Sequence, residues 1–191
     1  MYKFWAFLNR MKYIKRWSLM HSTQTENIME HSWQVATVAH ALVLINNKIF
    51  NGTADEKTVV LYAQYHETGE VITGDLPTPI KYFNPEITGA YKDLEKKACE
   101  RLLKMLPAEL EDSYKSYIFP DKDSYEAKLV KAADRISAYL KCVDELKSGN
   151  KEYKKASSSI KAELNKSELK EVEYFMKNIA PAYELTLDEL D

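Results

Sequence analysis

The sequence predicts an all-α protein. Apolar residues recur at intervals of three and four through most of the 191 residues. No segment shows the apolar–polar alternation of a half-buried strand, and no glycine-rich phosphate-binding pattern or internal repeat is present. Hydrophobic residues make up 45% of the chain and charged residues 29%, which is typical of globular proteins. A chain of this length is predicted to form a single domain over residues 1–191.

The first half of the chain is predicted to contain three helices, with an irregular stretch from Ser18 to Thr25 after the first. Thr25 or Thr23 is expected to cap the second helix. The third ends directly after His66-Glu67, because the glycines and prolines that follow are incompatible with a helix interior. The predicted extents are Phe4 to Ile14, Thr25 to the Asn51-Gly52 turn, and Asp55 to Glu67.

The second half is predicted to contain five further helices. Asn84-Pro85 begins the first of them by the usual placement of proline in an opening turn. The helix predicted from Ser124 to Lys147 has a strongly apolar face, and it ends at Ser148-Gly149. The predicted extents are Asn84 to Pro107, Ala108 to Tyr117 and Ser124 to Lys147, with two more helices before the acidic end.

Composition excludes several classes of protein. With 27 Lys and Arg against 29 Asp and Glu, the chain lacks the basic surplus needed to bind a nucleic acid polymer. No apolar run approaches the roughly 20 residues of a membrane span. Arg10 and Lys12 interrupt the aromatic start before a secretion signal can form. Cys99 and Cys142 lack paired spacing, so we expect packed free thiols and a cytoplasmic location.

Chemistry-bearing residues gather around two histidines. His66 and Glu70 are four residues apart and share a helix face, whereas Glu67 is expected to point about 100° away. With His31, such a cluster could hold a metal. Asp134 interrupts an apolar helix face, where a carboxylate is costly to bury unless it is paired or metal-bound. A salt bridge to a neighbouring helix, or to Arg135 or Lys131, is the alternative for Asp134.

The other two histidines favour ordinary interpretations. His40 lies nine residues after His31, on the opposite side of the same predicted helix, so the two cannot share a metal. His21 is expected to be a loop residue. A single helical histidine is more often a hydrogen-bonded residue than a ligand, so spacing alone leaves the metal site open.

The order of the motif narrows the interpretation. His31, then His66-Glu67, then a distant Asp134 resembles the HD-domain metal-dependent phosphohydrolases. The surrounding sequence segments are similar to the bacterial YfbR-like 5'-deoxynucleotidase family over nearly the whole chain. These segments are RWSLM at 16–20, TENIMEHSWQVA at 25–36, YHETGEVITGDLPTPIKYFN at 65–84, KAADRISAYLKCVDEL at 131–146 and the tail PAYELTLDEL.

This resemblance implies an HD-domain helical bundle that hydrolyses deoxyribonucleoside 5'-monophosphates to deoxynucleoside and phosphate. It implies a divalent metal held by His31, His66, Glu67 and Asp134. Mixed nitrogen and oxygen donors suit Co, Mn, Zn, Ni or Fe. The family also implies a homodimer.

One ligand position departs from the family pattern. Glu67 stands where the family has aspartate, and its side chain is one methylene longer. We expect a retained but weaker or altered metal site, because coordination is sensitive to such shifts. The alternatives are a non-catalytic nucleotide-binding protein, or another HD-type phosphohydrolase acting on a nucleoside diphosphate, triphosphate or cyclic diester.

Two carboxylates are implied to take part in catalysis. Glu70 would orient or deprotonate the attacking water. Asp75 would donate a proton to the leaving 5' oxygen if its surroundings raise its pKa. The alternatives are a solvated helix charge for Glu70 and a turn residue that satisfies local backbone amides for Asp75.

Two neighbouring residues are implied to bind the substrate. Arg16 can hold a phosphate bidentately, and it closes a stretch, Met1 to Gln24, that contains no acidic residue. Trp17 would wall the sugar pocket and exclude a 2' hydroxyl, the alternative being ordinary core packing. At His21 the family pattern has a basic residue, which leaves phosphate contacts there open.

Overall fold

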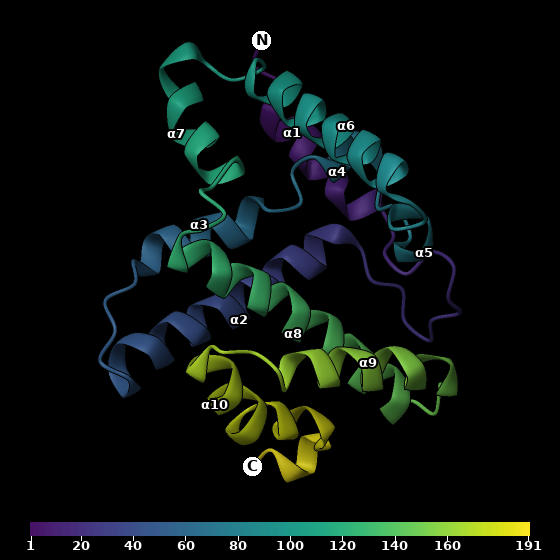
Figure 1. Ribbon diagram of the computed structural model, residues 1–191. Coiled ribbons are helices and arrows are strands. Elements are labelled where there is room, and N and C mark those ends of the chain that lie inside the picture. Colours follow the sequence, from purple (N-terminus) through teal and green to yellow (C-terminus); the bar gives the residue numbers. More distant parts are fainter.

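The computed structural model describes residues 1–191 and is helical throughout, with no strand (Figure 1). The all-α prediction is confirmed. The α-helices are α1 (Phe4–Leu8), α2 (Ile28–Ile49), α3 (Glu56–Tyr65), α4 (Glu70–Thr73), α5 (Thr78–Lys81), α6 (Pro85–Leu103), α7 (Ala108–Ile118), α8 (Tyr125–Lys147), α9 (Lys154–Leu164) and α10 (Lys170–Asn178). Short 3-10 helices are η1 (Asn9–Tyr13), η2 (Lys151–Tyr153), η3 (Ala180–Glu184) and η4 (Leu187–Glu189).

The start of α2 corrects the predicted cap. Asn27, rather than Thr23 or Thr25, precedes the first helical residue and accepts from the backbone amides of Met29 and Glu30. The Glu30 carboxylate accepts in return from the Asn27 amide, which completes a capping box. Two orphan amide groups at the start of α2 are thereby satisfied.

The first predicted helix is shorter than its apolar stripe suggests. Its α-helical part ends at Leu8 and continues as the 3-10 helix η1, after which Ile14 is extended. An isolated antiparallel bridge joins Lys15 to Asn27. The chain leaves the helix because its backbone pairs with the segment before α2, and this pairing carries residue 16 towards the centre of the molecule.

The stretch after α3 also differs from the prediction. α3 ends at Tyr65, so His66 caps the helix and residues 66–69 form turns. Two single-turn helices, α4 and α5, lie where we predicted irregular chain. Their glycines and prolines still obey the expected rule: Gly74, with φ 75°, ends α4, and Pro79 lies in the first turn of α5.

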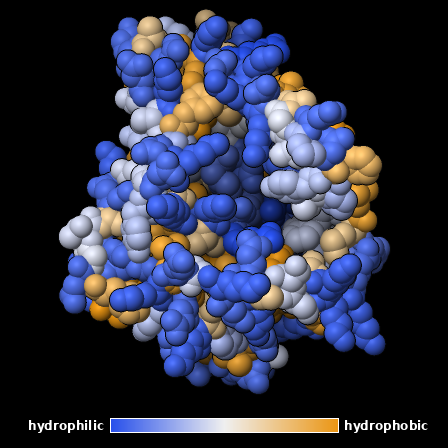
Figure 2. Space-filling view, viewed as in Figure 1, coloured by the Kyte–Doolittle hydropathy of each residue, from blue (hydrophilic) through white to orange (hydrophobic).

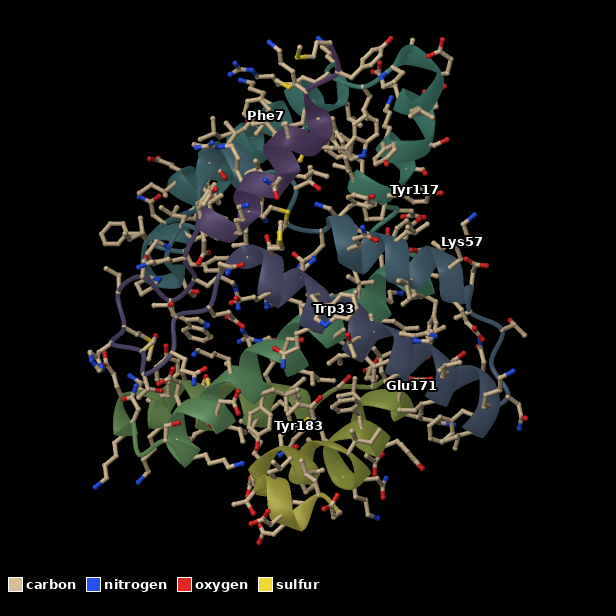
Figure 3. The ribbon with its side chains drawn as sticks, turned by 180° about the vertical axis from the view of Figure 1, so that it is seen from behind. Phe7, Trp33, Lys57, Tyr117, Glu171 and Tyr183 are labelled. Atoms are coloured by element: carbon tan, nitrogen blue, oxygen red, sulfur yellow. The ribbon has the colours of Figure 1, made fainter.

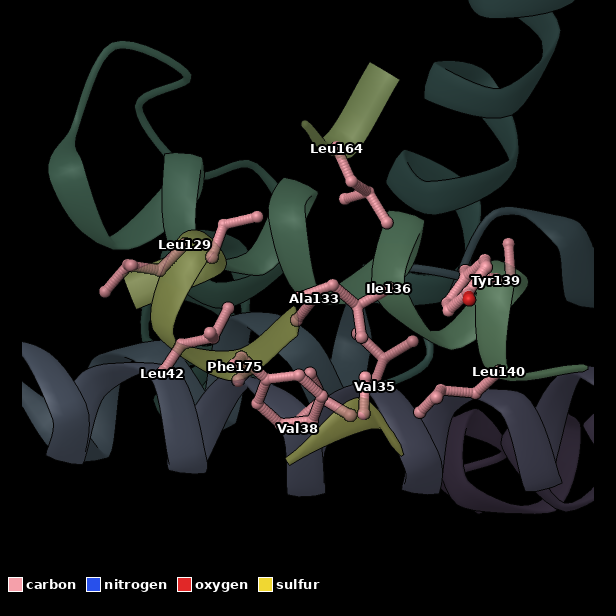
Figure 4. Packing of buried hydrophobic residues seen from close by; sticks show 14 of the residues in the cluster. Val35, Val38, Leu42, Leu129, Ala133, Ile136, Tyr139, Leu140, Leu164 and Phe175 are labelled. Carbon is pink, nitrogen blue, oxygen red and sulfur yellow. The ribbon is translucent and has the colours of Figure 1, made fainter. Parts of the chain in front are cut away.

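The main core lies between α2, α3, α8, α9 and α10 (Figure 4). Leu42, Leu129 and Ile136 are among its fully buried side chains. A smaller apolar cluster, built on Phe4 and Leu102, joins α1 to α6 and α7. Because α3 and α4 carry the chain directly from the first cluster to the second, we propose that residues 1–191 form one domain. No helix combines the length and apolar composition needed to cross a bilayer.

Candidate metal centre and active site

Four residues from three separate segments meet at the centre of the molecule. His31 comes from the first turns of α2, His66 and Glu67 from the turn after α3, and Asp134 from the middle of α8. One possible ligand atom from each lies within 4.8 Å of all the others. Ligands about 2.0–2.2 Å from a shared ion lie up to about 4.4 Å apart, so small side-chain shifts suffice for coordination.

The chemistry of the four residues fits a divalent cation. His66 donates from Nδ1 to the carbonyl oxygen of Ala63 at 2.6 Å, which leaves Nε2 as the free acceptor. That Nε2 is buried and has no hydrogen-bond partner. Two neutral imidazoles and the carboxylates of Glu67 and Asp134 would balance two positive charges.

Asp134, whose side chain is 41% exposed, is paired with a histidine of α2. Its Oδ1 lies 2.9 Å from Nε2 of the fully buried His31, whereas Arg135 pairs with Glu163 on α9. Burial raises the pKa of Asp134, but the hydrogen bond and charge of His31 lower it further, so the net pKa is lowered. Asp134 therefore forms the predicted pair with a neighbouring helix, here with His31 of α2. The same pair places both side chains in the cluster.

Glu67 does not point away from His66. The helical spacing predicted a separation of about 100° around the axis, but Glu67 Oε1 lies 3.4 Å from His66 Nε2 and 3.8 Å from His31 Nε2. The prediction was wrong because α3 ends at Tyr65 and the turn rotates Glu67 inwards. Burial raises the pKa of Glu67, and the neighbouring histidines and Arg16 lower it to below its ordinary range.

Glu70 lies at the start of α4 and is buried beside the cluster rather than within it. Its Oε1 is 3.7 Å from the Lys81 ammonium, and its Oε2 has no hydrogen-bond partner. Burial and the negative charges of Glu67 and Asp75 raise the pKa of Glu70 to about 10, against the opposing effect of Lys81. The structure does not support the alternative of a solvated helix charge, since only 4% of Glu70 is exposed.

The raised pKa of Glu70 has a measurable effect on stability. The folded metal-free protein holds a proton on Glu70 that the unfolded chain releases near its ordinary pKa of 4.5. This contribution to stability is fully present below that pH and is lost as the pH rises towards about 10. We expect the melting temperature of the metal-free protein to fall with pH relative to that of Glu70→Gln; parallel profiles between pH 5 and 9 would contradict the assignment.

Asp75 follows the turn that ends α4 and is half-buried. Burial and neighbouring charges act on its carboxylate, with no hydrogen bond among the causes of its pKa shift, so the alternative of a locally satisfied turn residue finds no support. Burial and the charge of Glu67 raise its pKa, while Arg16 and Lys81 oppose the change, and the net pKa is raised. Asp75, Glu70 and Arg16 all interact electrostatically with Glu67, so the three groups lie near the same carboxylate.

Arg16 and Trp17 follow η1, where the backbone pairs with the segment before α2. Burial lowers the pKa of Arg16, but four nearby carboxylates have the larger combined effect, so the net pKa is raised. These carboxylates belong to Glu26, Glu67, Asp134 and Asp75. The guanidinium therefore lies within electrostatic reach of the carboxylates of the cluster. Trp17 has φ 59°, a left-handed conformation that is rare for a bulky residue. Its ring packs on Tyr153, with the centroids 5.3 Å apart.

One face of the molecule is hollowed and polar. Figure 2 shows a hollow lined by hydrophilic residues between the α2–α8 layer and the helices above it. Trp33, two residues after His31, lies on the other side of α2 and is 77% exposed (Figure 3). His40 and His21 are exposed and take no part in the cluster, as expected.

Sequence reasoning missed two residues that contact the candidate site residues. Glu26 pairs with Arg16, and Lys81 lies between Glu70 and Glu95, 3.0 Å from the latter. Both residues lie in the sequence segments that resemble the family. Neither has its ion-pair partner three or four residues away, the spacing that would indicate a pair within one helix. Only the meeting of distant segments gives them their contacts.

Comparison with known proteins identifies the family. A family model described as 5'-deoxynucleotidase YfbR-like matches residues 3–183. The chain belongs to this family. Among its relatives, the 5'-deoxynucleotidase of Vibrio cholerae is 52% identical over 188 residues, covering 98% of this chain and 97% of the relative. The 5'-deoxynucleotidase of Enterobacter sp. strain 638 is 47% identical, covering 98% and 94% respectively.

Solved structures confirm the HD-domain bundle for this family member. An HD-domain phosphohydrolase from Listeria innocua superposes with a TM-score of 0.83 at 22% identity, covering 95% of this chain and 88% of that one. The cyanophage S-2L HD phosphohydrolase DatZ, bound to dA and one catalytic Zn²⁺ ion, gives 0.62 at 19% identity, covering 92% and 95%. At these identities the likeness concerns the fold.

Proposed function

We propose that this YfbR-like protein hydrolyses deoxyribonucleoside 5'-monophosphates to deoxynucleoside and phosphate with the help of a divalent metal. The observation that carries the proposal is the convergence of His31, His66, Glu67 and Asp134 at one point, within electrostatic reach of Arg16. The names of its relatives point to the same reaction. The dA and Zn²⁺ bound by DatZ support a deoxynucleoside in a site of this fold.

A divalent cation held by these four residues would lower the pKa of a water and neutralise charge on the phosphoryl group. Glu70 is protonated at neutral pH in the metal-free chain and can accept a proton only once positive charge nearby has lowered its pKa. It would then orient the water and take its proton. Asp75, whose pKa is also raised, would donate a proton to the leaving 5' oxygen.

Arg16 and Trp17 would bind the substrate. The guanidinium can donate two parallel hydrogen bonds to the phosphate, and it lies near enough to the carboxylate cluster to hold the phosphoryl group beside a bound metal. Trp17 would close the sugar pocket against a 2' hydroxyl, because a stiff indole leaves no room for an added polar atom. No residue is assigned to reading the base, so we expect several deoxynucleotides to be accepted.

The test is phosphate release from dAMP, dTMP and AMP by metal-stripped protein, titrated separately with Co, Mn, Zn and Mg. Metal-dependent release from the deoxy substrates alone is the expected result. Folded protein that binds dAMP but releases no phosphate with any metal would replace the proposal with a nucleotide-binding function. Faster release from di- or triphosphates or a cyclic diester would indicate another HD-type phosphohydrolase.

Glu67 is expected to serve as a ligand despite its length, since its carboxylate already reaches both imidazoles. We therefore expect Glu67→Asp to remain active and to change the apparent metal affinity by about tenfold, within the range that local ligand adjustments produce. Metal titration followed by phosphate release measures both quantities. If the wild type carries no metal and only Glu67→Asp gains metal and activity, Glu67 disables the site.

Three finer expectations accompany this function. The identity of the native ion among Co, Mn, Zn, Ni and Fe is decided by the metal titration. A homodimer, implied by the family, is checked by sedimentation of the purified chain. A cytoplasmic location agrees with the two buried, unpaired thiols of Cys99 and Cys142, and fractionation of expressing cells tests it.

A further inference from the structure

One carboxylate oxygen joins the two residues assigned to substrate binding. Glu26 Oε2 accepts from Arg16 Nη1 at 2.5 Å and from the indole Nε1 of Trp17 at 3.2 Å. Its backbone carbonyl also accepts from the Arg16 amide at 2.9 Å. The Glu26 side chain is only 11% exposed, so these bonds form where water competes little.

The bonds to Glu26 hold a conformation that the local chain does not favour. Trp17 adopts φ 59°, which costs energy for a bulky residue and persists only where the surroundings fix it. Three restraints act on its side chain: the Glu26 carboxylate on the indole N–H, the tilted ring of Tyr153, and the Arg16 guanidinium 5.9 Å from the ring centroid. The carboxylate is the directional one, because a ring contact alone permits rotation.

The pairing still leaves Arg16 able to bind a phosphate. Glu26 uses one Nη1 donor, and the remaining N–H groups of the guanidinium stay free for a bidentate contact. Because the two donors share one oxygen, a shift of the guanidinium moves the acceptor of the indole. The phosphate contact and the wall of the sugar pocket are therefore fixed relative to one another.

We propose that Glu26 is a positioning residue that sets the preference for deoxyribonucleotides over ribonucleotides by fixing Trp17 relative to Arg16. The inference rests on the proposed function. Glu26 also lies next to Asn27, the cap of α2, and α2 carries His31. The element that discriminates the sugar is thus tied to the helix that supplies a metal ligand.

The test compares Glu26→Ala and Glu26→Gln with the wild type, using kcat/KM for dAMP and for AMP at a saturating concentration of the best metal. Glu30→Gln is the matched control, because Glu30 is exposed, lies four residues away, and glutamine preserves a capping box. We expect Glu26→Ala to lower the dAMP:AMP preference at least about tenfold, with the detection limit for AMP setting the wild-type value if its AMP turnover is not measurable. The reason is that the indole which excludes the 2' hydroxyl is no longer held in place.

Glu26→Gln keeps one oxygen that can accept from the indole, so it should retain more of the dAMP:AMP preference. It also loses the ion pair that holds the Arg16 guanidinium, so KM should rise for both nucleotides. A merely structural role for Glu26 would lower stability and both rates together and leave the preference unmoved, and that result would overturn the inference. If Glu26→Ala does not fold, an unchanged preference in Glu26→Gln with unchanged KM overturns it equally. A wild type that releases phosphate from neither nucleotide would instead remove the proposed function, and this inference with it.

Discussion

Asp134→Ala is expected to abolish metal binding and to lower phosphate release at least about a thousandfold, because the metal supplies both the activated water and the charge neutralisation. Asp134 is the member of the cluster contributed by α8, and it contacts the buried His31 at 2.9 Å. Its removal takes away one of two anionic ligands and frees the imidazole to turn. Metal content measured by elemental analysis, together with phosphate release from dAMP, checks the prediction.

The matched control for this prediction lies on the same helix. Asp144→Ala makes the same change at an exposed position of α8 outside the cluster, and should leave metal content and activity near those of the wild type. A folded Asp134→Ala protein that retains a full equivalent of metal would remove Asp134 from the ligand set.

Glu70→Gln is expected to reduce kcat by about 10²- to 10⁴-fold while leaving metal content unchanged, the usual loss when a general base is removed. Glu70 is not among the four residues whose ligand atoms converge, but burial and the charges of Glu67 and Asp75 raise its pKa to about 10. Its KM for dAMP should change little, since no contact with the substrate in the ground state is assigned to it. Steady-state kinetics with dAMP gives both constants.

Glu95→Gln is the companion variant. Glu95 also pairs with Lys81, more closely than Glu70 does, but lies on α6 and is more exposed. It should stay within a few-fold of wild-type activity, as is typical of solvated ion pairs. Equal losses in the two variants would mean that Lys81 and its pairing, rather than proton transfer by Glu70, account for the effect.

The helices were predictable because their signals are local. Apolar periodicity located α2, α3, α6 and α8, and the caps Asp55, Asn84 and Ser124 satisfy nearby amides within each segment. Errors fell where a non-local contact overrode local preference. The first helix ends early because the backbone at Lys15 pairs with Asn27, a residue twelve positions later that the periodicity of the helix does not include.

The sequence by itself determined the residue types of the candidate site and the family to which the chain belongs. It supplied two histidines and two carboxylates in an order that the fold brings together, since that order follows from which helices they occupy. It also located Arg16 and Trp17 next to each other, although not what holds them.

Only the tertiary structure decided how these side chains face one another. Glu67 turns towards the histidines because α3 ends one residue before His66, and Glu26 joins Arg16 to Trp17 because the chain pairs back on itself before α2. The pKa of Glu70 is set by burial against charges from other segments. Direction, burial and charge depend on distances between segments remote in sequence, and local patterns carry no information on those distances.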